Sequence, residues 1–432
     1  MGKVLVLTVG SRPEPLITSI NTLKNILNPD SVLFVCSEDT KETQGSHTTL
    51  PKIFEKTGEI PHEILPVPPD DPEKCISRIW SKLEELKKEG KQIVVDYTGG
   101  TKTMSVSLFW VATHLNLGIY LTTGIRRNLV AIKEGETTRR IHLSFPYYEE
   151  LLSVVDSLLA NYHYTSAEEN LRSALANYHF SPEIQEELQR KLEIIDAFRL
   201  WDAYDSLNAI VKMKPYKKAF WNDYVSFWDR VAADRMKLEE DFAKEVEERQ
   251  IPIYSKDQPT QYAIVQDLVL NAERCAVRER YDDATARLYR AMEALAQLRL
   301  FTEHGIKTWD VEIERLPGEL RRKYEEKRRE GKIKIGLIED YELLWELKDE
   351  VGNLFKARED DLREALRRRN QSIFAHGFKS ISKLEYDSII KARIEGFIKD
   401  CLKGILKGRY QEPKQLPKSL EEIDRLLTSA GL

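Results

Sequence analysis

The feature that most constrains the fold is a change in hydrophobic patterning near residue 145. Before this position, short apolar runs rich in β-branched residues alternate with stretches of helical periodicity. The runs are VLVLTV (4–9), SVLFVC (31–36), EILPV (63–67), QIVVDY (92–97) and GIYLTT (118–123), and the clearest helical stretches between them are 73–89 and 101–116. Apolar strands separated by helices are typical of a parallel sheet that is covered on both faces.

The strand signals stop after residues 128–145, which predict a hairpin with Gly135 in its turn. Helical patterns then continue to the end of the chain. We therefore expect an α/β part followed by an all-α part: a Rossmann-like domain at 1–146, connecting helices at 147–257 and a helical domain at 258–432. A chain of 432 residues is long enough for two or three domains.

The charge balance and the cysteines exclude several classes of protein. With 66 Lys and Arg against 71 Asp and Glu, the net charge is 66 − 71 = −5, so a nucleic-acid site must be a local patch. The four cysteines are scattered, and neither CxxC nor HExxH occurs, which indicates a reducing cytoplasm and no metal site. We expect a soluble chain, because no apolar run approaches the roughly 18 residues of a membrane helix and no signal peptide is evident.

Two loops with unusual composition follow predicted strands, at the sheet edge where α/β proteins bind their ligands. TVGSRPEP follows the first strand and contains Gly10, Ser11 and Arg12, and DYTGGTKTMS follows the fourth strand and contains residues 99–103 where a helix begins. Small residues let backbone N–H groups and the helix dipole face an anion, and Lys102 adds a positive charge. The spacing matches neither the Walker A motif nor GxGxxG. A tight turn with a solvated lysine is the alternative.

The segment RRRNQSIFAHG, residues 367–377, places two polar residues on an apolar helical stripe. The stripe consists of Leu362, Leu366, Arg369, Ile373 and His376, which fall within about 80° of a helical wheel. This spacing predicts that Arg369 and His376 point the same way, about 10 Å apart along one helix. Gly377 is the expected C-cap.

An arginine and a histidine that share a cleft suit phosphodiester cleavage. The guanidinium stabilises the charged phosphorane, and the imidazole transfers protons. Because the two side chains are too far apart to meet on one atom, a two-fold axis that pairs the stripe with its own copy would bring them together. The alternative is structural: an arginine paired with a buried carboxylate, and a histidine stabilised by the C-terminal end of a helix.

These motifs resemble those of a known family. RRRNQSIFAHG resembles the signature of HEPN ribonucleases, and DYTGGTKTMS together with TVGS resembles the ligand loops of CARF domains. Residues 271–297 also resemble the first helices of the HEPN part in one branch of the family. In this order, the motifs are similar to the CARF–HEPN ribonucleases of type III CRISPR systems, which act in antiviral defence.

The resemblance implies a homodimer in which a cyclic oligoadenylate is the allosteric activator and single-stranded RNA is the substrate. It implies cleavage without a metal or other cofactor, by attack of the ribose 2′-OH to leave a 2′,3′-cyclic phosphate. Arg369 and His376 become the catalytic pair, supported by Asn370. The implied ligand contacts are Gly10, Ser11, Arg12, Thr98, Gly99, Gly100, Thr101, Lys102 and Thr103.

The sequence also allows two other functions and leaves two alternative roles open for each of two further segments. The chain is alternatively a non-catalytic nucleotide sensor that recruits a partner, or a mononucleotide-binding metabolic enzyme, although the latter is disfavoured by the absence of an acid/base constellation near Gly99. Arg287, Arg290 and Glu293 recur at helical spacing and either support the catalytic cleft or form exposed ion pairs. The basic segment 321–335 is either a solvated helix face or an RNA contact.

Overall fold

The computed structural model describes residues 2–37, 46–124, 126–127, 130–131, 137–141, 144–178, 180–326, 328 and 332–432. The chain forms two compact units. The first comprises residues 1–149 with 175–184, and the second comprises 150–174 with 185–432. Each unit is described by itself.

The first unit is built on a six-stranded sheet in the order β3-β2-β1-β4-β5-β8. The strands are β1 (Lys3–Thr8), β2 (Ser31–Ser37), β3 (His62–Val67), β4 (Gln92–Asp96), β5 (Gly118–Thr123) and β8 (Thr137–Ile141). The first five are parallel, and β8 pairs with β5 in the antiparallel direction. The predicted parallel sheet is confirmed.

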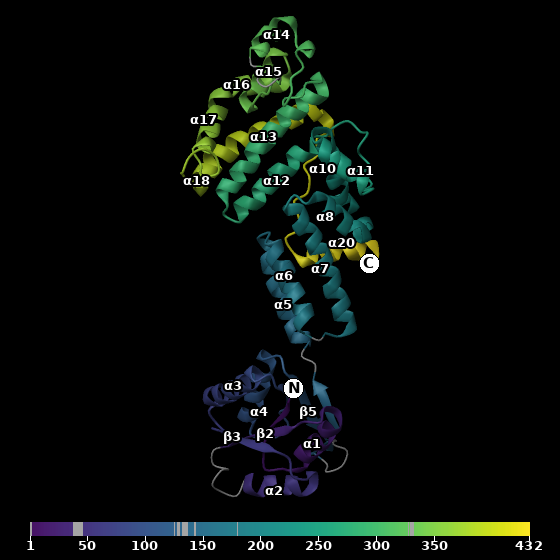
Figure 1. Ribbon diagram of the computed structural model, residues 1–432, viewed down its shortest axis with the longest axis vertical. Helices are drawn as coiled ribbons and strands as arrows, with labels where there is room; N and C mark the ends of the chain where they lie inside the picture. The colour runs from purple at the N-terminus through teal and green to yellow at the C-terminus, as the bar shows by residue number, and fades with distance from the viewer. Residues whose placement is uncertain are drawn as a thin grey trace. The chain divides into compact units, whose positions relative to one another are not determined.

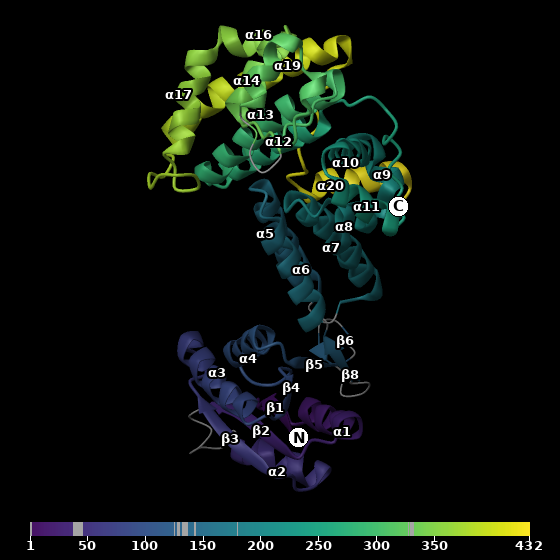
Figure 2. The same ribbon diagram turned by 45° about the horizontal axis from the view of Figure 1, so that its top comes forward.

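Helices cover both faces of this sheet. One face packs on α1 (Glu14–Leu27) and α2 (Ser46–Thr57), and the other on α3 (Pro72–Lys88) and α4 (Lys102–His114), as Figure 2 shows. Because β1 lies between β2 and β4, the strand order reverses at β1. The loops after β1 and β4 therefore leave the same edge on opposite sides of a switch point, where ligands of α/β sheets bind.

The predicted hairpin over residues 128–145 is wrong. Within that segment, β8 joins the main sheet beside β5, whereas β7 (Val130–Ala131) pairs with β6 (Arg126–Arg127). Pairing with β8 covers an edge of the parallel sheet that would otherwise expose its hydrogen-bonding groups. The predicted turn residue Gly135 lies outside the described residues.

The second unit is helical, as predicted, and Figure 1 shows its arrangement. Its first helices are α5 (Ser144–Ala160), α6 (Tyr164–Asn177), α7 (Pro182–Asp202), α8 (Ser206–Met213), α9 (Lys217–Phe220), α10 (Ser226–Leu238) and α11 (Glu240–Glu248). The later helices are α12 (Ala263–Val277), α13 (Tyr281–His304), α14 (Gly318–Glu325), α15 (Leu337–Glu346), α16 (Glu350–Ala357), α17 (Glu359–Asn370), α18 (Lys383–Glu385), α19 (Gly396–Leu406) and α20 (Leu420–Ala430). A continuous apolar core joins α12 to α19.

The last helix returns to the connecting helices. The ammonium of Lys191 on α7, whose side chain is almost fully buried, contacts Asp424 on α20 at 2.5 Å. The hydroxyl of Tyr164 donates to the carbonyl of Pro417 at 2.6 Å, and the backbone N–H of Leu420 donates to Asp156 at 2.6 Å. The segment after α19 therefore ties the end of the chain to helices that precede residue 257. The predicted three-part division of the chain stays a prediction.

In the described parts of the chain, every helix is too short or too polar to cross a lipid bilayer.

Candidate functional site

The two polar loops of the first unit meet through their glycines. A Cβ on Gly10 would lie 2.9 Å from the backbone nitrogen of Gly100, and a Cβ on Gly99 would lie 2.1 Å from the carbonyl oxygen of Thr8. Gly100 has a φ of +81°, which favours glycine. The Thr8 hydroxyl then donates to the Gly99 carbonyl at 2.6 Å. Only glycines allow the two loops to pack this closely.

The buried carboxylate of Asp96 fixes the loop after β4 through hydrogen bonds. Asp96, which is fully buried, accepts hydrogen bonds from Ser19 on α1 at 2.7 Å, from Thr122 on β5 at 3.1 Å and from the backbone N–H of Thr98 at 2.8 Å. The Thr98 hydroxyl also bonds to Asp96 and accepts from the backbone N–H of Thr122. Burial raises the pKa of Asp96, and these hydrogen bonds oppose that rise. Asp96 thus joins α1, β5 and the ligand loop.

The loop ends at the first turn of α4. The Thr101 hydroxyl caps this helix by accepting from the backbone N–H of Met104 at 3.2 Å, and it donates to the carbonyl of Pro69 at 2.9 Å. Lys102 and Thr103 follow as the first helical residues, whose N–H groups have no acceptor within the helix. Lys102 is exposed and, within the part of the chain that the structure describes, makes no ion pair.

The predicted ligand residues are therefore brought together. Ser11 and Arg12, both exposed, follow Gly10 and precede α1, while Thr98 and residues 99–103 form the facing loop. Free helix N–H groups, the positive end of the α4 dipole and two cations favour an anionic ligand at this edge. The geometry is suited to phosphate recognition.

The helix that carries Arg369 ends earlier than predicted. Helix α17 stops at Asn370, and Gln371 is its C-cap. His376 therefore lies in the loop after the helix rather than one turn further along the same face. Ile373 is 53% exposed, so the apolar stripe ends at Leu366. Asn370 and Ser372 favour the helix end, because short polar side chains compete with helical hydrogen bonds.

The loop after α17 is compact and folds back on the helix. The backbone N–H of His376 donates to the carbonyl of Asn370 at 3.2 Å, and that of Ile373 donates to the carbonyl of Lys379 at 3.1 Å. Gly377 is not the C-cap. A Cβ there would lie 2.0 Å from the carbonyl oxygen of Gln371, so Gly377 lets the loop close against the end of the helix. His376 itself is exposed.

Arg369 is held by two neighbours. Its guanidinium carbon lies 3.9 Å from the ring centroid of Tyr289 on α13, which is within the range of a cation–π contact. Its Nη1 donates to the side-chain oxygen of Asn370 at 3.1 Å. Tyr289 therefore supports one face of the guanidinium, and Asn370 fixes its orientation within the plane.

The residues expected to support this cleft form ion pairs along α13. Arg290 contacts Glu293 at 3.0 Å, and Arg287 contacts Asp283 at 2.7 Å. Asp340 on α15 is 1% exposed, and one of its carboxylate oxygens is buried without a hydrogen-bond partner. Burial raises the pKa of Asp340 to about 9, and the negative charge of Glu293 adds to the rise. Asp340 is therefore a neutral acid at pH 7.

Large apolar side chains are exposed within the loop that carries His376 and on α18, which follows it. The exposed fractions are 53% for Ile373, 59% for Phe374, 96% for Phe378 and 76% for Leu384. Monomeric proteins rarely expose so many neighbouring apolar side chains, and such patches mark interaction surfaces. The patch adjoins Arg369 and His376 in the sequence.

Sequence reasoning missed Tyr289 and Asp96. Asp96 ends the run QIVVD, so a lone carboxylate at the end of an apolar strand was the available signal. Tyr289 lies 80 residues before Arg369, and no local pattern links the two. Among the described residues, no three His, Cys, Asp or Glu side chains gather where they could bind a metal.

Comparison with known families assigns both units. Residues 3–123 match the Csa3 CRISPR-associated Rossmann-like domain, and residues 255–400 match the Csm6 HEPN domain. The chain joins a CRISPR-associated Rossmann-like domain of the CARF type to a Csm6 HEPN domain. The matched HEPN segment contains α12 to α17 with Arg369 and His376, and the matched Rossmann-like segment contains both ligand loops.

A solved structure agrees with this assignment at the level of the fold. The structure of Enterococcus italicus Csm6 bound to cyclic hexa-2′-fluoro-hexa-dAMP is 13% identical, with a TM-score of 0.62, and the match covers 100% of this chain and 99% of that one. Can2 from Sulfobacillus thermosulfidooxidans in complex with cyclic tetra-adenylate is 14% identical over 44% of this chain and 58% of that one. Its TM-score of 0.24 is too low to support a conclusion. None of the curated proteins compared with the chain matches it.

Proposed function

We propose that this protein is an endoribonuclease of CRISPR antiviral defence that a cyclic oligoadenylate activates. The observation that carries the proposal is the presence, in one chain, of a Csm6 HEPN domain and a CRISPR-associated Rossmann-like domain with a glycine-built anion loop. The similar Csm6 structure contains a cyclic oligonucleotide. In this chain, the ligand is expected at Gly10, Ser11, Arg12 and Thr98 through Thr103.

The proposed reaction needs only groups of the chain and the substrate. Arg369, held on Tyr289, neutralises the charge that develops on the scissile phosphate. The ribose 2′-OH attacks the phosphorus in line, the P–O5′ bond breaks, and a 2′,3′-cyclic phosphate and a 5′-OH result. His376 transfers a proton between the two oxygens. DNA lacks the 2′-OH and is not cleaved.

A homodimer completes the proposed site. One copy presents Arg369 and an exposed His376 beside the apolar patch of Ile373, Phe374, Phe378 and Leu384. Pairing this patch with its own copy would bury it and bring two Arg–His sets into one cleft. All four cysteines are free and buried, in keeping with the cytoplasmic location that we propose.

The proposal is tested by cleavage of a fluorescent single-stranded RNA, with and without cyclic tetra- and hexa-adenylate. We expect cleavage that needs one ring size, persists in EDTA, spares DNA of the same sequence, and is lost in Arg369→Ala and in His376→Ala. Arg367→Ala on the same helix and His163→Ala, both at exposed positions, are the matched controls.

Two results would contradict the proposal. Loss of cleavage in EDTA, restored by a divalent cation, would contradict the metal-independent reaction. If neither ring size gives cleavage although the wild-type protein binds a ring, the chain is a non-catalytic sensor instead.

A further inference from the structure

A cavity of about 580 Å³ lies between the connecting helices and the HEPN helices, within the second unit. It is lined from α7, α8 and α10 on one side and from α12 and α13 on the other. This volume is typical of small-molecule sites. The cavity shares no lining residue with the predicted catalytic set or with the ligand loops.

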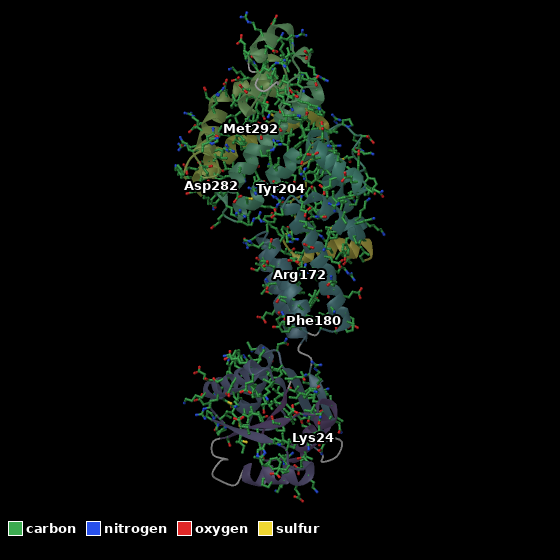
Figure 3. The ribbon with its side chains drawn as sticks, viewed as in Figure 1. Lys24, Arg172, Phe180, Tyr204, Asp282 and Met292 are labelled. Carbon is green, nitrogen blue, oxygen red and sulfur yellow. The ribbon has the colours of Figure 1, made fainter. Side chains whose placement is uncertain are left out.

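The cavity has aromatic walls. Trp201, which is buried and stacks on Trp228 at 4.4 Å, forms part of the inner wall. Tyr204, labelled in Figure 3, comes from the turn between α7 and α8. Trp309 follows α13 and is 36% exposed. Flat aromatic surfaces of this kind stack on planar rings.

One polar group in the cavity has unused bonding capacity. Asp267 on α12 is 3% exposed, and its Oδ1 accepts from the indole N–H of Trp201 at 2.9 Å. Among the described residues, its second oxygen accepts no hydrogen bond, and it is not one of the fully buried polar atoms that lack a partner, so it is open to the cavity. Buried carboxylates are normally satisfied on both oxygens. The carboxylate is therefore prepared to accept one N–H group from a ligand.

The charged residues that line the cavity do not favour a cation or a phosphate as its ligand. The Arg235 guanidinium donates to Glu239 at 2.7 Å, and that of Arg290 donates to Glu293 at 3.0 Å. Because each arginine is paired, neither offers a free charge to a phosphate. The lining also contains the carboxylates of Glu239 and Asp267, so two positive and two negative groups balance and favour an uncharged ligand.

We infer that this cavity binds a purine base that carries an exocyclic amine, stacked on the exposed rings of Tyr204 and Trp309 and donating its amine to Asp267. The base belongs either to a free nucleoside or to bound RNA. The inference does not depend on the proposed ribonuclease activity, since binding to the cavity is measured directly.

The test is titration of the full-length protein with adenosine and with purine riboside, which has the same ring without the amine. We expect saturable binding of adenosine by calorimetry and about tenfold weaker binding of purine riboside, because one charge-assisted hydrogen bond is lost. Absence of saturable adenosine binding at millimolar concentration, or equal affinity for the two nucleosides, would overturn the inference.

Two variants separate the site from general effects on folding. Asp267→Asn keeps an acceptor for Trp201 but removes the second carboxylate oxygen, and Trp309→Leu changes an exposed position. Both should weaken adenosine binding about tenfold, whereas Trp345→Leu, at an exposed tryptophan of α15, should not. Unchanged affinity in both variants would place the nucleoside elsewhere.

A competition experiment identifies the source of the base. If adenosine displaces a labelled single-stranded RNA from the wild-type protein but not from Trp309→Leu, the cavity holds a base of the RNA. If adenosine binds without displacing RNA, the ligand is a free nucleoside. Either outcome supports the site.

Discussion

The loop after β4 and the loop after α17 each depend on a glycine with no room for a Cβ, yet their surroundings differ. In the Rossmann-like domain, Gly99 is fixed by bonds from Thr8 and Ser105, and Asp96 holds the adjacent Thr98 from beneath. In the HEPN domain, His376 is exposed at the end of a loop bordered by exposed apolar side chains.

This difference indicates which features of the proposed ligand site and of the proposed catalytic site a single copy of the chain can form by itself. The ligand loop has its backbone fixed before any anion arrives, so little reorganisation is needed on binding. The loop after α17 fixes the backbone of His376, but among the described residues the imidazole makes no hydrogen bond, ion pair or ring contact. A second copy is the natural source of that neighbour, as the homodimer proposal requires.

The largest effect is expected for Lys102→Ala, which tests whether the ligand loop acts through charge. In the proposed homodimer the ring would contact one lysine from each copy, so affinity for the cyclic oligoadenylate should fall by about a hundredfold, and activation should be lost. The melting temperature should stay unchanged, since Lys102 is exposed. Calorimetry with the cyclic ring measures the affinity, and an unchanged value would remove Lys102 from the site.

The glycines test the comparison directly. Gly99→Ala should weaken activator binding by about a hundredfold, and Gly377→Ala should slow cleavage by about a hundredfold while leaving activator affinity intact, because small displacements of catalytic groups have effects of this size. Gly404→Ala, at a position where a Cβ meets nothing within 4 Å, is the control. The comparison fails if Gly377→Ala changes activator affinity and leaves the cleavage rate unaltered.

Tyr289 tests how far one copy orients its own arginine. Tyr289→Leu should slow single-turnover RNA cleavage by about tenfold, because it removes a cation–π contact of about 1 kcal/mol or more. Tyr289→Phe keeps the ring and should retain the wild-type rate. Equal losses in the two variants would show that the phenol hydroxyl, rather than the face of the ring, is what matters.

Asp340 is expected to affect stability alone, without an effect on activator binding or on RNA cleavage. Its pKa is about 9 in the folded protein, against an ordinary value of 3.8, so the unfolded chain loses this proton first. The stability that depends on the neutral acid is complete below about pH 4, the ordinary pKa, and is lost progressively as the pH rises toward the raised pKa of the folded protein. The free energy of unfolding of Asp340→Asn should not show this fall with rising pH. Parallel profiles of the two proteins between pH 5 and 8 would contradict it.

The sequence predicts the first domain better than the catalytic loop. The predicted strands at 31–36 and 118–123 agree with β2 and β5 within one residue, because continuous apolar runs between helices have few other stable arrangements. The ligand loops follow from the same topology. Both families of the resemblance are confirmed by the matched segments.

Hydrophobic periodicity could not predict the position of His376. The apolar spacing continues through Ile373, but the chain leaves the helix at Asn370, because the loop gains bonds such as that from the Ile373 N–H to the Lys379 carbonyl, which a continuing helix could not form. The contact of Arg369 with Tyr289 depends on the packing of α17 against α13, which no local signal encodes. Site roles assigned to single residues stay predictions until the variants are measured.

The return of the last segment to the connecting helices limits how the chain can be divided. Gln415 accepts from the buried Arg274 on α12 at 2.6 Å, and α20 lies against α7 through Asp424 and Lys191. In sequence, the HEPN helices thus lie between two segments, the connecting helices and the last segment, which pack against each other. A chimera that exchanges the HEPN helices would therefore have to include both the connecting helices and the last segment.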